Sequence, residues 1–334
     1  MIKEALKAVS EGRDLDRETA LATMNDIMSG EAGEILTAAF LTALHMKGET
    51  TEEIAAFAQG MRNHALPIHR EGDLLEIVGT GGDQLFTFNV STIASFVIAA
   101  SGVRIAKHGN RSASSKCGAA DVLEALGVDL MLEPEKNEQV LQETNQCFMF
   151  AQKYHPAMKY VGAVRRQIGI PTVFNLLGPL TNPANANLQL MGVYSESLLE
   201  PMTEVLMQLG VERAMVVRGN DGMDEITLTT TTEVREFKDG KIEAYTLDPR
   251  DYGMEYCKLE DLVGGAPEVN KQITIDVLKG QKGPQRDIVV LNAAAAIHIA
   301  TGKSIAEAVK EAEKILDSGK AYEQLQHFVK ATNC

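Results

Sequence analysis

The first part of the chain carries apolar side chains at helical spacing. One stripe occupies residues 2–9, and a second occupies residues 21–28. Residues 35–46 are apolar on nearly every face, which predicts a helix that is buried or packed against another subunit. Thr50 and Glu53 have the spacing of a capping box, which opens one more helix. The region therefore predicts a bundle of four helices without strands.

From residue 74 the pattern changes to short apolar runs that alternate with helical stretches. The runs read "LLEIV", "VRIA", "CFMF", "LQLMGV" and "AMVVRG", with helices expected near residues 90–101, 119–126 and 198–209. Strands that alternate with helices indicate parallel βαβ units. The stretch "EVREFKDGKIEAYTL" instead predicts a hairpin that turns at Asp239-Gly240 and lies at an edge of the sheet.

These patterns divide the chain into two predicted domains. Residues 1–66 form a small all-helical N-terminal domain, and residues 72–334 form a large α/β domain with a mainly parallel central sheet. The tail is expected to be helical over residues 288–300, 304–316 and 322–329. Residues 165–188 are rich in Gly, Pro and Asn, and we expect ordered loops around one short helix that cross back to the helical domain.

Composition narrows the possible functions of the 334 residues. A hydrophobic content of 45% supports a full core, while a net charge of −14 and the absence of Trp argue against nucleic-acid binding. The four cysteines form no CxxC pair, so free thiols in a reducing compartment are expected. The N-terminus reads as an amphipathic helix rather than a signal peptide, and no apolar run reaches the roughly 18–20 residues of a membrane span. We therefore expect a soluble, cytoplasmic protein.

The stretch "GTGGDQLFTFNVST", residues 79–92, follows a predicted strand and opens a helix. Glycines let backbone N–H groups approach a ligand closely, and a helix N-terminus favours an anion, most often a phosphate. The spacing fits neither GxGxxG nor a P-loop, which argues against NAD and P-loop ATP sites. Asp83 beside a phosphate suggests a ligand that also carries hydroxyls, a metal or positive charge. Taken alone, the stretch also fits a tight turn with N-capping Ser and Thr.

A basic loop follows the next predicted strand. Lys107, His108, Arg111 and Lys116 lie within ten residues of an otherwise acidic chain, interleaved with Gly, Asn and Ser. A solvated charge run would not need those small residues, whereas a loop that wraps phosphates would. The two loops meet at the carboxyl edge of a parallel sheet, where such folds bind ligands.

Two further segments carry candidate chemistry. "NDGMDEITL" supplies Asp221, Asp224 and Glu225, which either remain in water or hold Mg²⁺ against a ligand's phosphates. The segment from 148 to 169 carries His155 and Arg165, and an arginine is the natural bidentate partner of a carboxylate. Arg165 alone also fits an ordinary surface arginine.

Four motifs in order, "GTGGD…TFNVST", "KHGNRSASSK", "FNLLGPLTNPA" and "DGMDE", resemble the anthranilate phosphoribosyltransferase family of the tryptophan pathway over essentially the whole chain. The resemblance implies the nucleoside-phosphorylase-like phosphoribosyltransferase fold and a homodimer joined through the helical domains. It implies transfer of the phosphoribosyl group of 5-phosphoribosyl 1-diphosphate (PRPP) to anthranilate, with two Mg²⁺ ions per subunit. No covalent nucleophile is expected, and Lys107 would act electrostatically.

The resemblance also implies a role for each matching residue. PRPP would be bound by Gly79, Gly82, Asp83, Thr87, Asn89, Val90, Ser91, Thr92, Lys107, His108, Gly109, Asn110, Arg111, Ser112, Ala113, Ser114, Ser115 and Ala119. Anthranilate would be bound or bordered by Gly79, His108, Asn110, His155, Arg165, Gly178 and Pro179. One Mg²⁺ would be held by Ser91 and Glu225, and a second by Asp224 and Glu225.

Alternative functions and departures from the family pattern stay open at this point. A pyrimidine nucleoside phosphorylase would not need the paired acids, and a nucleic-acid-binding relative would need a basic face. Gln84 stands where the family usually has Gly, a residue that permits positive φ. Cys117 and Ala119 replace serines, and the basic surroundings of Cys117 predict a lowered thiol pKa and a thiol that oxidises readily.

Overall fold

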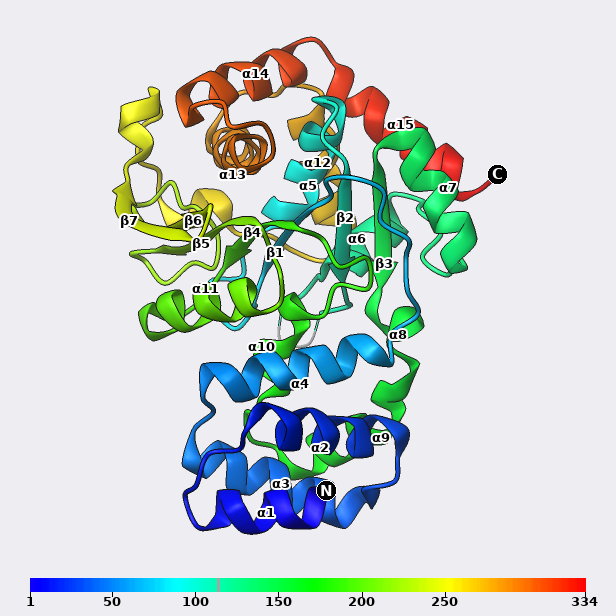
Figure 1. Ribbon diagram of the computed structural model, residues 1–334. Coiled ribbons are helices and arrows are strands. Elements are labelled where there is room, and N and C mark those ends of the chain that lie inside the picture. The colour runs from blue at the N-terminus through cyan, green and yellow to red at the C-terminus, as the bar shows by residue number, and fades with distance from the viewer. Residues whose placement is uncertain (113–114) are drawn as a thin grey trace.

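The computed structural model describes residues 1–112 and 115–334 and shows a helical lobe beneath a larger α/β lobe (Figure 1). The helical lobe begins with the four predicted helices: α1 (Ile2–Ser10), α2 (Arg17–Ser29), α3 (Gly33–Lys47) and α4 (Thr51–Asn63). The predicted capping box at Thr50 and Glu53 is present at the start of α4. The helix α3 is not buried on every face, because Ile35 is 86% exposed and Met46 is 82% exposed.

The α/β lobe is built on one seven-stranded sheet in the order β3-β2-β1-β4-β5-β6-β7. Its strands are β1 (Leu75–Gly79), β2 (Ile105–Gly109), β3 (Gln146–Phe150), β4 (Leu188–Gly192), β5 (Arg213–Gly219), β6 (Thr232–Lys238) and β7 (Lys241–Leu247). The first five strands are parallel, and β6 and β7 form the predicted antiparallel hairpin at the edge.

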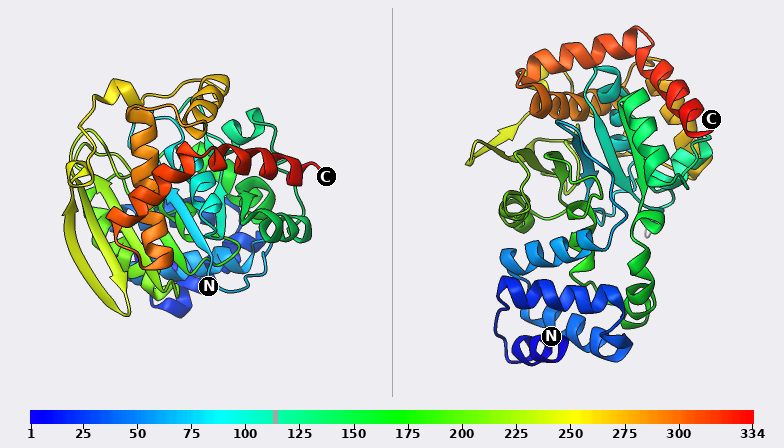
Figure 2. Two further views of the ribbon diagram at one scale, coloured as in Figure 1. Left: turned by 90° about the horizontal axis from the view of Figure 1, so that it is seen from above. Right: turned by 45° about the vertical axis from the view of Figure 1, so that its right-hand side comes forward.

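Helices cover both faces of this sheet (Figures 1 and 2). The helices that follow β1 along the chain are α5 (Val90–Ala100), α6 (Ala119–Ala125), α7 (Pro134–Thr144), α8 (Ala151–Tyr154), α9 (Lys159–Ile168), α10 (Phe174–Leu177), α11 (Leu199–Gln208), α12 (Pro267–Leu278), α13 (Pro284–Thr301), α14 (Ile305–Asp317) and α15 (Lys320–Thr332). Of these, α9 and α10 pack on the helical lobe instead of the sheet. Short 3-10 turns η1 to η5 occupy Pro156–Met158, Gly178–Leu180, Glu196–Leu198, Pro249–Tyr252 and Leu259–Leu262.

The two largest hydrophobic cores among the described residues meet the sheet from opposite sides. Leu190 and Val217 point into the core around α5 and α13, while Met191 and Val216 point into the core shared with α11 and the helical lobe. This alternation is the period of two that a strand imposes on its side chains. The second core therefore joins the two lobes.

The chain returns to the helical lobe earlier than the sequence predicted. The helix α9 packs against α3 and α2, and α10 packs against α4, so the returning segment includes α9 as well as the predicted loops. No helix was predicted from the sequence at α7, α9 or α12, and α7 and α12 each carry Pro in the first turn. In the described residues no single helix is long and apolar enough to cross a membrane. Only α13 and α14 together reach that length, with a bend of 119° between them.

Candidate active site

A cavity of about 680 Å³ lies at the carboxyl ends of β1 and β2. It brings together most of the predicted site residues: Gly79, Gly82, Asp83, Thr87, Asn89, Val90, Ser91, Thr92, Lys107, His108, Gly109, Asn110, Arg111, Ser112, Ser115, Ala119, Asp224 and Glu225. Ala113 and Ser114 lie outside the described residues. The wall also includes Pro171, Asn175 and Tyr194, which the sequence did not single out.

The glycine turn after β1 has backbone conformations that few side chains tolerate. Gly81 and Gly82 have φ of 70° and 88°, and the turn continues with positive φ at Gln84 (59°) and Phe86 (56°). A non-glycine residue in this region stores strain, which persists only where the surroundings hold it in place. The conformation that glycine favours at residue 84 is therefore kept although the side chain has changed.

The absence of a side chain at Gly79 makes room for the buried carboxylate of Asp224. A Cβ at this position would lie 2.3 Å from Oδ2 of Asp224, so only glycine leaves room for that carboxylate. Gly192 has the same role in β4, where a Cβ would lie 1.6 Å from the backbone oxygen of Asp224. The carboxylate of Asp224 then accepts a hydrogen bond of 2.6 Å from the N–H of Gly81. The glycines thus leave room for the Asp224 carboxylate against the turn that follows β1.

Asp224 and Glu225 lie near Lys107 in this cavity, and Asp83 lies near Asp224. Glu225 accepts a hydrogen bond of 3.2 Å from the N–H of Ser91 at the start of α5. Burial, together with the charges of Asp83 and Glu225, raises the pKa of Asp224 well above its usual range. Burial also raises the pKa of Glu225 to about 7, and the charge of Lys107 opposes that shift. The cluster is thus short of positive charge.

Lys107 lies beside Asp224 and Glu225 and is only 3% exposed. Its Nζ donates hydrogen bonds of 2.7 Å to the carbonyl of Ile77 and 3.0 Å to Oγ of Ser91. Burial lowers the pKa of Lys107, while the carboxylates of Glu225 and Glu76 act to raise it. The ammonium group is fixed in direction by these two bonds.

Asp83, Asp224 and Glu225 could supply part of the coordination shell of a divalent cation, and a bound ligand would supply the rest. Among the described residues, Oδ2 of Asp83 is buried without a hydrogen-bond partner, and no group of three or more Asp, Glu, His or Cys side chains is arranged to hold an ion alone. Mg²⁺ commonly binds through one or two carboxylates, water and substrate phosphates. The residues present therefore fit Mg²⁺ together with a phosphate-bearing ligand.

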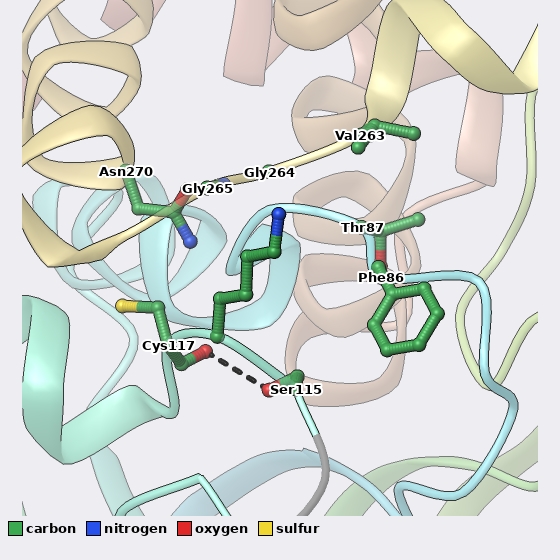
Figure 3. Close-up of a pocket in the computed structure, with 9 residues that line it drawn as sticks. Phe86, Thr87, Ser115, Cys117, Val263, Gly264, Gly265 and Asn270 are labelled. Atoms are coloured by element: carbon green, nitrogen blue, oxygen red, sulfur yellow. Dashed lines mark hydrogen bonds between the residues drawn. The ribbon is translucent and has the colours of Figure 1, made fainter.

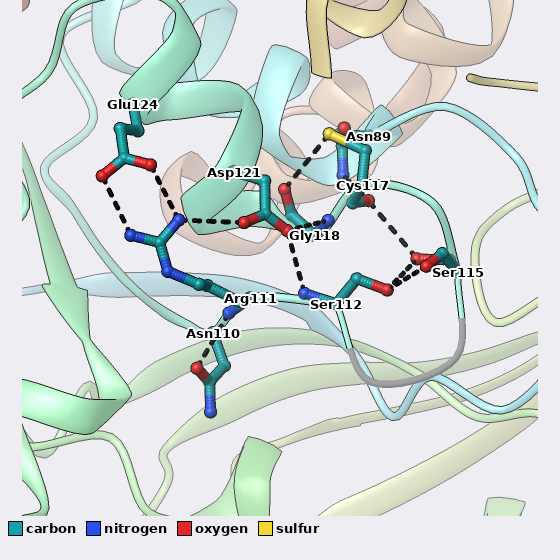
Figure 4. A network of polar contacts seen from close by, with 9 residues as sticks. All are labelled: Asn89, Asn110, Arg111, Ser112, Ser115, Cys117, Gly118, Asp121 and Glu124. Atoms are coloured by element: carbon teal, nitrogen blue, oxygen red, sulfur yellow. Dashed lines mark hydrogen bonds and ion pairs between the residues drawn. The ribbon is translucent and has the colours of Figure 1, made fainter. Parts of the chain in front are cut away.

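The basic loop is held by the N-terminus of α6 (Figure 4). Arg111 forms ion pairs with Asp121 at 3.0 Å and Glu124 at 2.8 Å, so its guanidinium group is turned onto α6. Asp121 also accepts hydrogen bonds from the N–H groups of Ser112 and Gly118. A Cβ at Gly118 would lie 2.4 Å from the nitrogen of Ser112, so this close crossing requires glycine.

Two histidines lie behind the basic loop, with ring centroids 4.9 Å apart. Burial lowers the pKa of His108 well below its ordinary value, and the neighbouring His155 adds to that shift. Burial lowers the pKa of His155 to about 4, and its Nε2 lies 3.0 Å from the carbonyl of Thr181. Both rings are therefore neutral at neutral pH.

Arg165 lies on α9, on the helical-lobe side of the site. Its guanidinium group stacks 5.4 Å from the centre of the Phe174 ring, and burial lowers its pKa. Within the described part of the chain, His155, Arg165, Gly178 and Pro179 are not among the residues that line the cavity. Of these, His155 contacts the cavity wall through His108.

Comparison with known proteins identifies the family. The helical bundle domain of a glycosyl transferase family matches residues 3–65, and the a/b domain of the same family matches residues 71–322. The chain is 55% identical to anthranilate phosphoribosyltransferase of Methanobrevibacter smithii, and the match covers 100% of both sequences. The chain belongs to the anthranilate phosphoribosyltransferase family. The resemblance, the fold class and the enzyme class predicted from the sequence are confirmed.

Solved structures agree with this family. The anthranilate phosphoribosyltransferase of Thermus thermophilus superposes with a TM-score of 0.94 at 44% identity and 99% coverage of each chain. The enzyme from Saccharomyces cerevisiae, in complex with PRPP and Mg, gives a TM-score of 0.92 at 27% identity, covering 99% of this chain and 98% of the yeast chain. The yeast enzyme is also known in complex with 4-fluoroanthranilate.

One expectation for this member of the family is wrong. The basic surroundings of Cys117 predicted a lowered thiol pKa, whereas burial raises the pKa of Cys117 to about 11 and the charge of Asp121 adds to the shift. The thiol is only 5% exposed, and the nearby Arg111 is already paired with the acids of α6. A thiol in this state is inert at neutral pH, so Cys117 is not the reactive thiol that was expected.

Proposed function

We propose that the chain transfers the 5-phosphoribosyl group of PRPP to the amine of anthranilate, giving N-(5-phosphoribosyl)anthranilate and diphosphate, as a step of tryptophan biosynthesis. The observation that carries this proposal is the meeting, in one cavity, of a glycine turn, a basic loop and the buried acids Asp224 and Glu225. Membership of the family and the yeast complexes support the same substrates. The four cysteines are free in the described structure, which supports a cytoplasmic location.

We assign the PRPP site to the residues that the sequence predicted. The phosphates would be bound by the backbone of the glycine turn, the N-terminus of α5 and the loop from Lys107 to Ser115, with Ala119 at its end. We assign two Mg²⁺ ions to the acids, one to Ser91 and Glu225 and one to Asp224 and Glu225. When bound, Mg²⁺ would neutralise the charge that develops on the leaving diphosphate.

The chain's own contribution to the reaction is positioning and electrostatics. No covalent nucleophile is needed, because the aromatic amine of anthranilate attacks the anomeric carbon directly and the diphosphate leaves with the electrons of the broken C–O bond. The nitrogen then gives up one proton, to solvent or to the diphosphate, and becomes the neutral secondary amine of the product. Lys107 directs Oγ of Ser91 and places positive charge beneath the acids. Such preorganised charge commonly accounts for about 10²–10³-fold of rate.

Anthranilate, which accepts the phosphoribosyl group, would enter the site from the side of the helical lobe. We assign the anthranilate site to Gly79, His108, Asn110, His155, Arg165, Gly178 and Pro179. Burial keeps both imidazoles neutral, so we assign the carboxylate of anthranilate to the half-buried Arg165 and not to a histidine. The stacking of Arg165 on Phe174 holds its guanidinium plane in place.

The decisive experiment follows the loss of anthranilate fluorescence after PRPP and Mg²⁺ are mixed with the purified chain. Consumption of anthranilate that depends on both PRPP and Mg²⁺ supports the proposal. Phosphorolysis of a pyrimidine nucleoside by the same preparation, without consumption of anthranilate, would replace it with the nucleoside phosphorylase alternative.

Replacing Arg165 with Ala is expected to raise the KM for anthranilate about tenfold or more, because a charge-assisted pair is lost. The kcat and the KM for PRPP should change by less than about threefold. Steady-state kinetics with each substrate varied in turn gives the measurement. Arg166→Ala is the matched control, since Arg166 is the exposed neighbour on the same helix. Equal effects of the two substitutions would remove Arg165 from the anthranilate site.

We propose that the protein is a homodimer joined through its helical lobes. The helix α3 exposes Ile35 and Met46, which lie about three turns apart on one face, away from the face that buries Leu44. We also propose the domain boundaries 1–66 and 72–334, with part of 165–188 added to the helical unit, because α10 packs on α4.

Ile35→Glu is expected to shift the protein from dimer to monomer in sedimentation equilibrium, because a charge would be buried in the subunit interface. Ile242→Glu, a similar change at a residue that is 37% exposed on β7, should leave the mass unchanged. A wild-type chain that sediments as a monomer at micromolar concentration would exclude the dimer.

A further inference from the structure

A buried asparagine joins the C-terminal part of the chain to the glycine turn. Asn270 lies on α12 and is only 2% exposed. Its Oδ1 accepts a hydrogen bond of 2.7 Å from the N–H of Gly265, and its Nδ2 donates one of 2.9 Å to Oδ1 of Asn89. The Nδ2 of Asn89 in turn donates a hydrogen bond of 3.1 Å to the carbonyl of Cys117. Four residues from three segments therefore form one chain of hydrogen bonds.

The donor-to-acceptor direction of this series of hydrogen bonds is fixed by the backbone groups at its two ends. The N–H of Gly265 can only donate, so it selects the oxygen of Asn270, and the carbonyl of Cys117 can only accept, so it selects the NH₂ group of Asn89. Both ends require the same orientation of the two amides, with Asn270 donating to Asn89. The arrangement is thus determined by backbone groups, and neither amide can flip without breaking a bond at one end.

The backbone around Asn270 is built to bring these segments close. The N–H of Phe88 donates to the carbonyl of Leu262 at 3.1 Å, and the N–H of Gly264 donates to the carbonyl of Phe86 at 2.9 Å. A Cβ on Gly264 would lie 2.8 Å from both Oδ1 of Asn270 and Cα of Phe88, so only glycine permits the crossing. A cavity of about 250 Å³ lies between the three segments (Figure 3).

The segments that Asn270 joins are those that form the proposed PRPP site. Asn89 is the N-cap residue of α5, but in the described structure its side chain makes no capping bond and bonds to Asn270 and Cys117 instead. Cys117 ends the basic loop directly before α6, and Phe86 has a positive φ of 56° that its surroundings must hold. Loss of Asn270 would remove one of the two hydrogen bonds that orient the Asn89 amide, which itself bridges the start of α5 and the end of the basic loop.

We propose that Asn270 is a positioning residue for PRPP: it fixes the amide of Asn89 and sets the distance between the glycine turn and the basic loop. This inference rests on the proposed function for the identity of the ligand. It does not depend on anthranilate, because the residues that Asn270 positions belong to the PRPP side of the cavity. A loss of Asn270 should therefore weaken PRPP binding selectively.

The test compares Asn270→Ala and Asn270→Asp with the wild type and with Gln272→Ala. Gln272 is an exposed amide on the same helix whose side chain bonds only to Asp276 among the described residues, so it is the matched control. Asn270→Ala should raise the KM for PRPP about tenfold, with the KM for anthranilate and kcat changed by less than about threefold. Asn270→Asp should be no better, because a carboxylate cannot donate to Asn89 while it accepts from Gly265.

Calorimetric titration of PRPP with Mg²⁺, without anthranilate, separates this inference from the proposed function. If the wild type binds PRPP and Asn270→Ala binds it about tenfold more weakly, the role of Asn270 stands even where transfer to anthranilate is absent. The Asn89→Ala and Asn270→Ala double variant should bind PRPP more tightly than the product of the two single losses predicts. Unchanged PRPP affinity in Asn270→Ala, or equal losses for both substrates, would overturn the proposal.

Discussion

The double substitution Asp224→Asn and Glu225→Gln is expected to abolish turnover at ordinary Mg²⁺ concentrations and, at the same time, to raise the Tm of the ligand-free protein. The loss of kcat/KM should be at least about 10³-fold, because both proposed metal positions lose their carboxylates. The rise in Tm follows from the burial of the two acids, since amides of the same shape carry no charge to be desolvated.

The raised pKa values of Asp224 and Glu225 determine whether the stability of the ligand-free wild type rises or falls with pH. Glu225 has a folded-state pKa of about 7 against an ordinary value of 4.5, and the pKa of Asp224 is also raised. The folded wild type therefore holds protons that the unfolded chain has released, so its stability falls as pH rises from about 4.5 to about 7. The double variant lacks this dependence, and its advantage in Tm should grow over the same interval.

Thermal unfolding at several pH values, with and without PRPP and Mg²⁺, gives the measurement. The ligands should raise the Tm of the wild type and leave that of the double variant nearly unchanged. Asp251→Asn with Glu255→Gln is the matched control, because it removes the same two charges from exposed positions. A double variant that keeps near wild-type kcat would show that the metal assignment is wrong.

The three clusters that line the cavity could be found from the sequence because each lies in or just after the carboxyl end of a strand, Lys107 within β2 itself. Parallel strands bring their carboxyl ends to one edge, so Asp83, Lys107 and Asp224 meet although they are far apart along the chain. The replacement of the family's usual glycine by Gln84 suggested a stiffer or reshaped loop, whereas the structure keeps a positive φ at that residue. Local sequence thus identifies groups that are placed by the general rules of α/β folds.

Asn270 could not be found in this way. The hydrogen bond to Asn89 spans 181 residues, and nothing nearby distinguishes a buried asparagine in the first turns of a helix from an exposed one. Cys117 shows the same limit, because the sequence displays its basic neighbours but neither its burial nor the acids that pair with Arg111. Burial and pairing are tertiary properties, and they decide both the role of an amide and the pKa of a thiol.

Replacing Lys107 with Met is expected to lower kcat/KM about 10²-fold at neutral pH and to move the pH profile upward. Methionine keeps an unbranched apolar chain but removes the cation beneath the acids. The pKa of Glu225 and of Glu76 is already about 7 for each, with burial as the main cause and Lys107 as an opposing influence. Without Lys107 both pKa values should rise further, so both acids are protonated at neutral pH.

The pH profile distinguishes this electrostatic role from simple loss of stability. As pH increases from about 7 to about 9, Lys107→Met should recover part of its activity, because Glu225 ionises and can again bind Mg²⁺, whereas the wild type gains little. Raising the Mg²⁺ concentration should shift the recovery to lower pH, since metal binding and proton binding compete at the same carboxylate.

Lys47 provides a matched control for a buried lysine between two acids. Its side chain is 5% exposed, and Nζ lies 2.9 Å from Glu53 and 2.6 Å from Asp14 in the helical lobe, away from the cavity. Lys47→Met should lower Tm, because Glu53 loses its buried partner, while the pH profile of kcat/KM keeps the shape of the wild type. If both lysine variants lost activity only in proportion to the folded fraction, with parallel pH profiles, Lys107 would be a structural cation. A profile displaced only in Lys107→Met would mean that the charge on Lys107 sets the ionisation of Glu225, and thereby the pH range in which the acids can hold Mg²⁺.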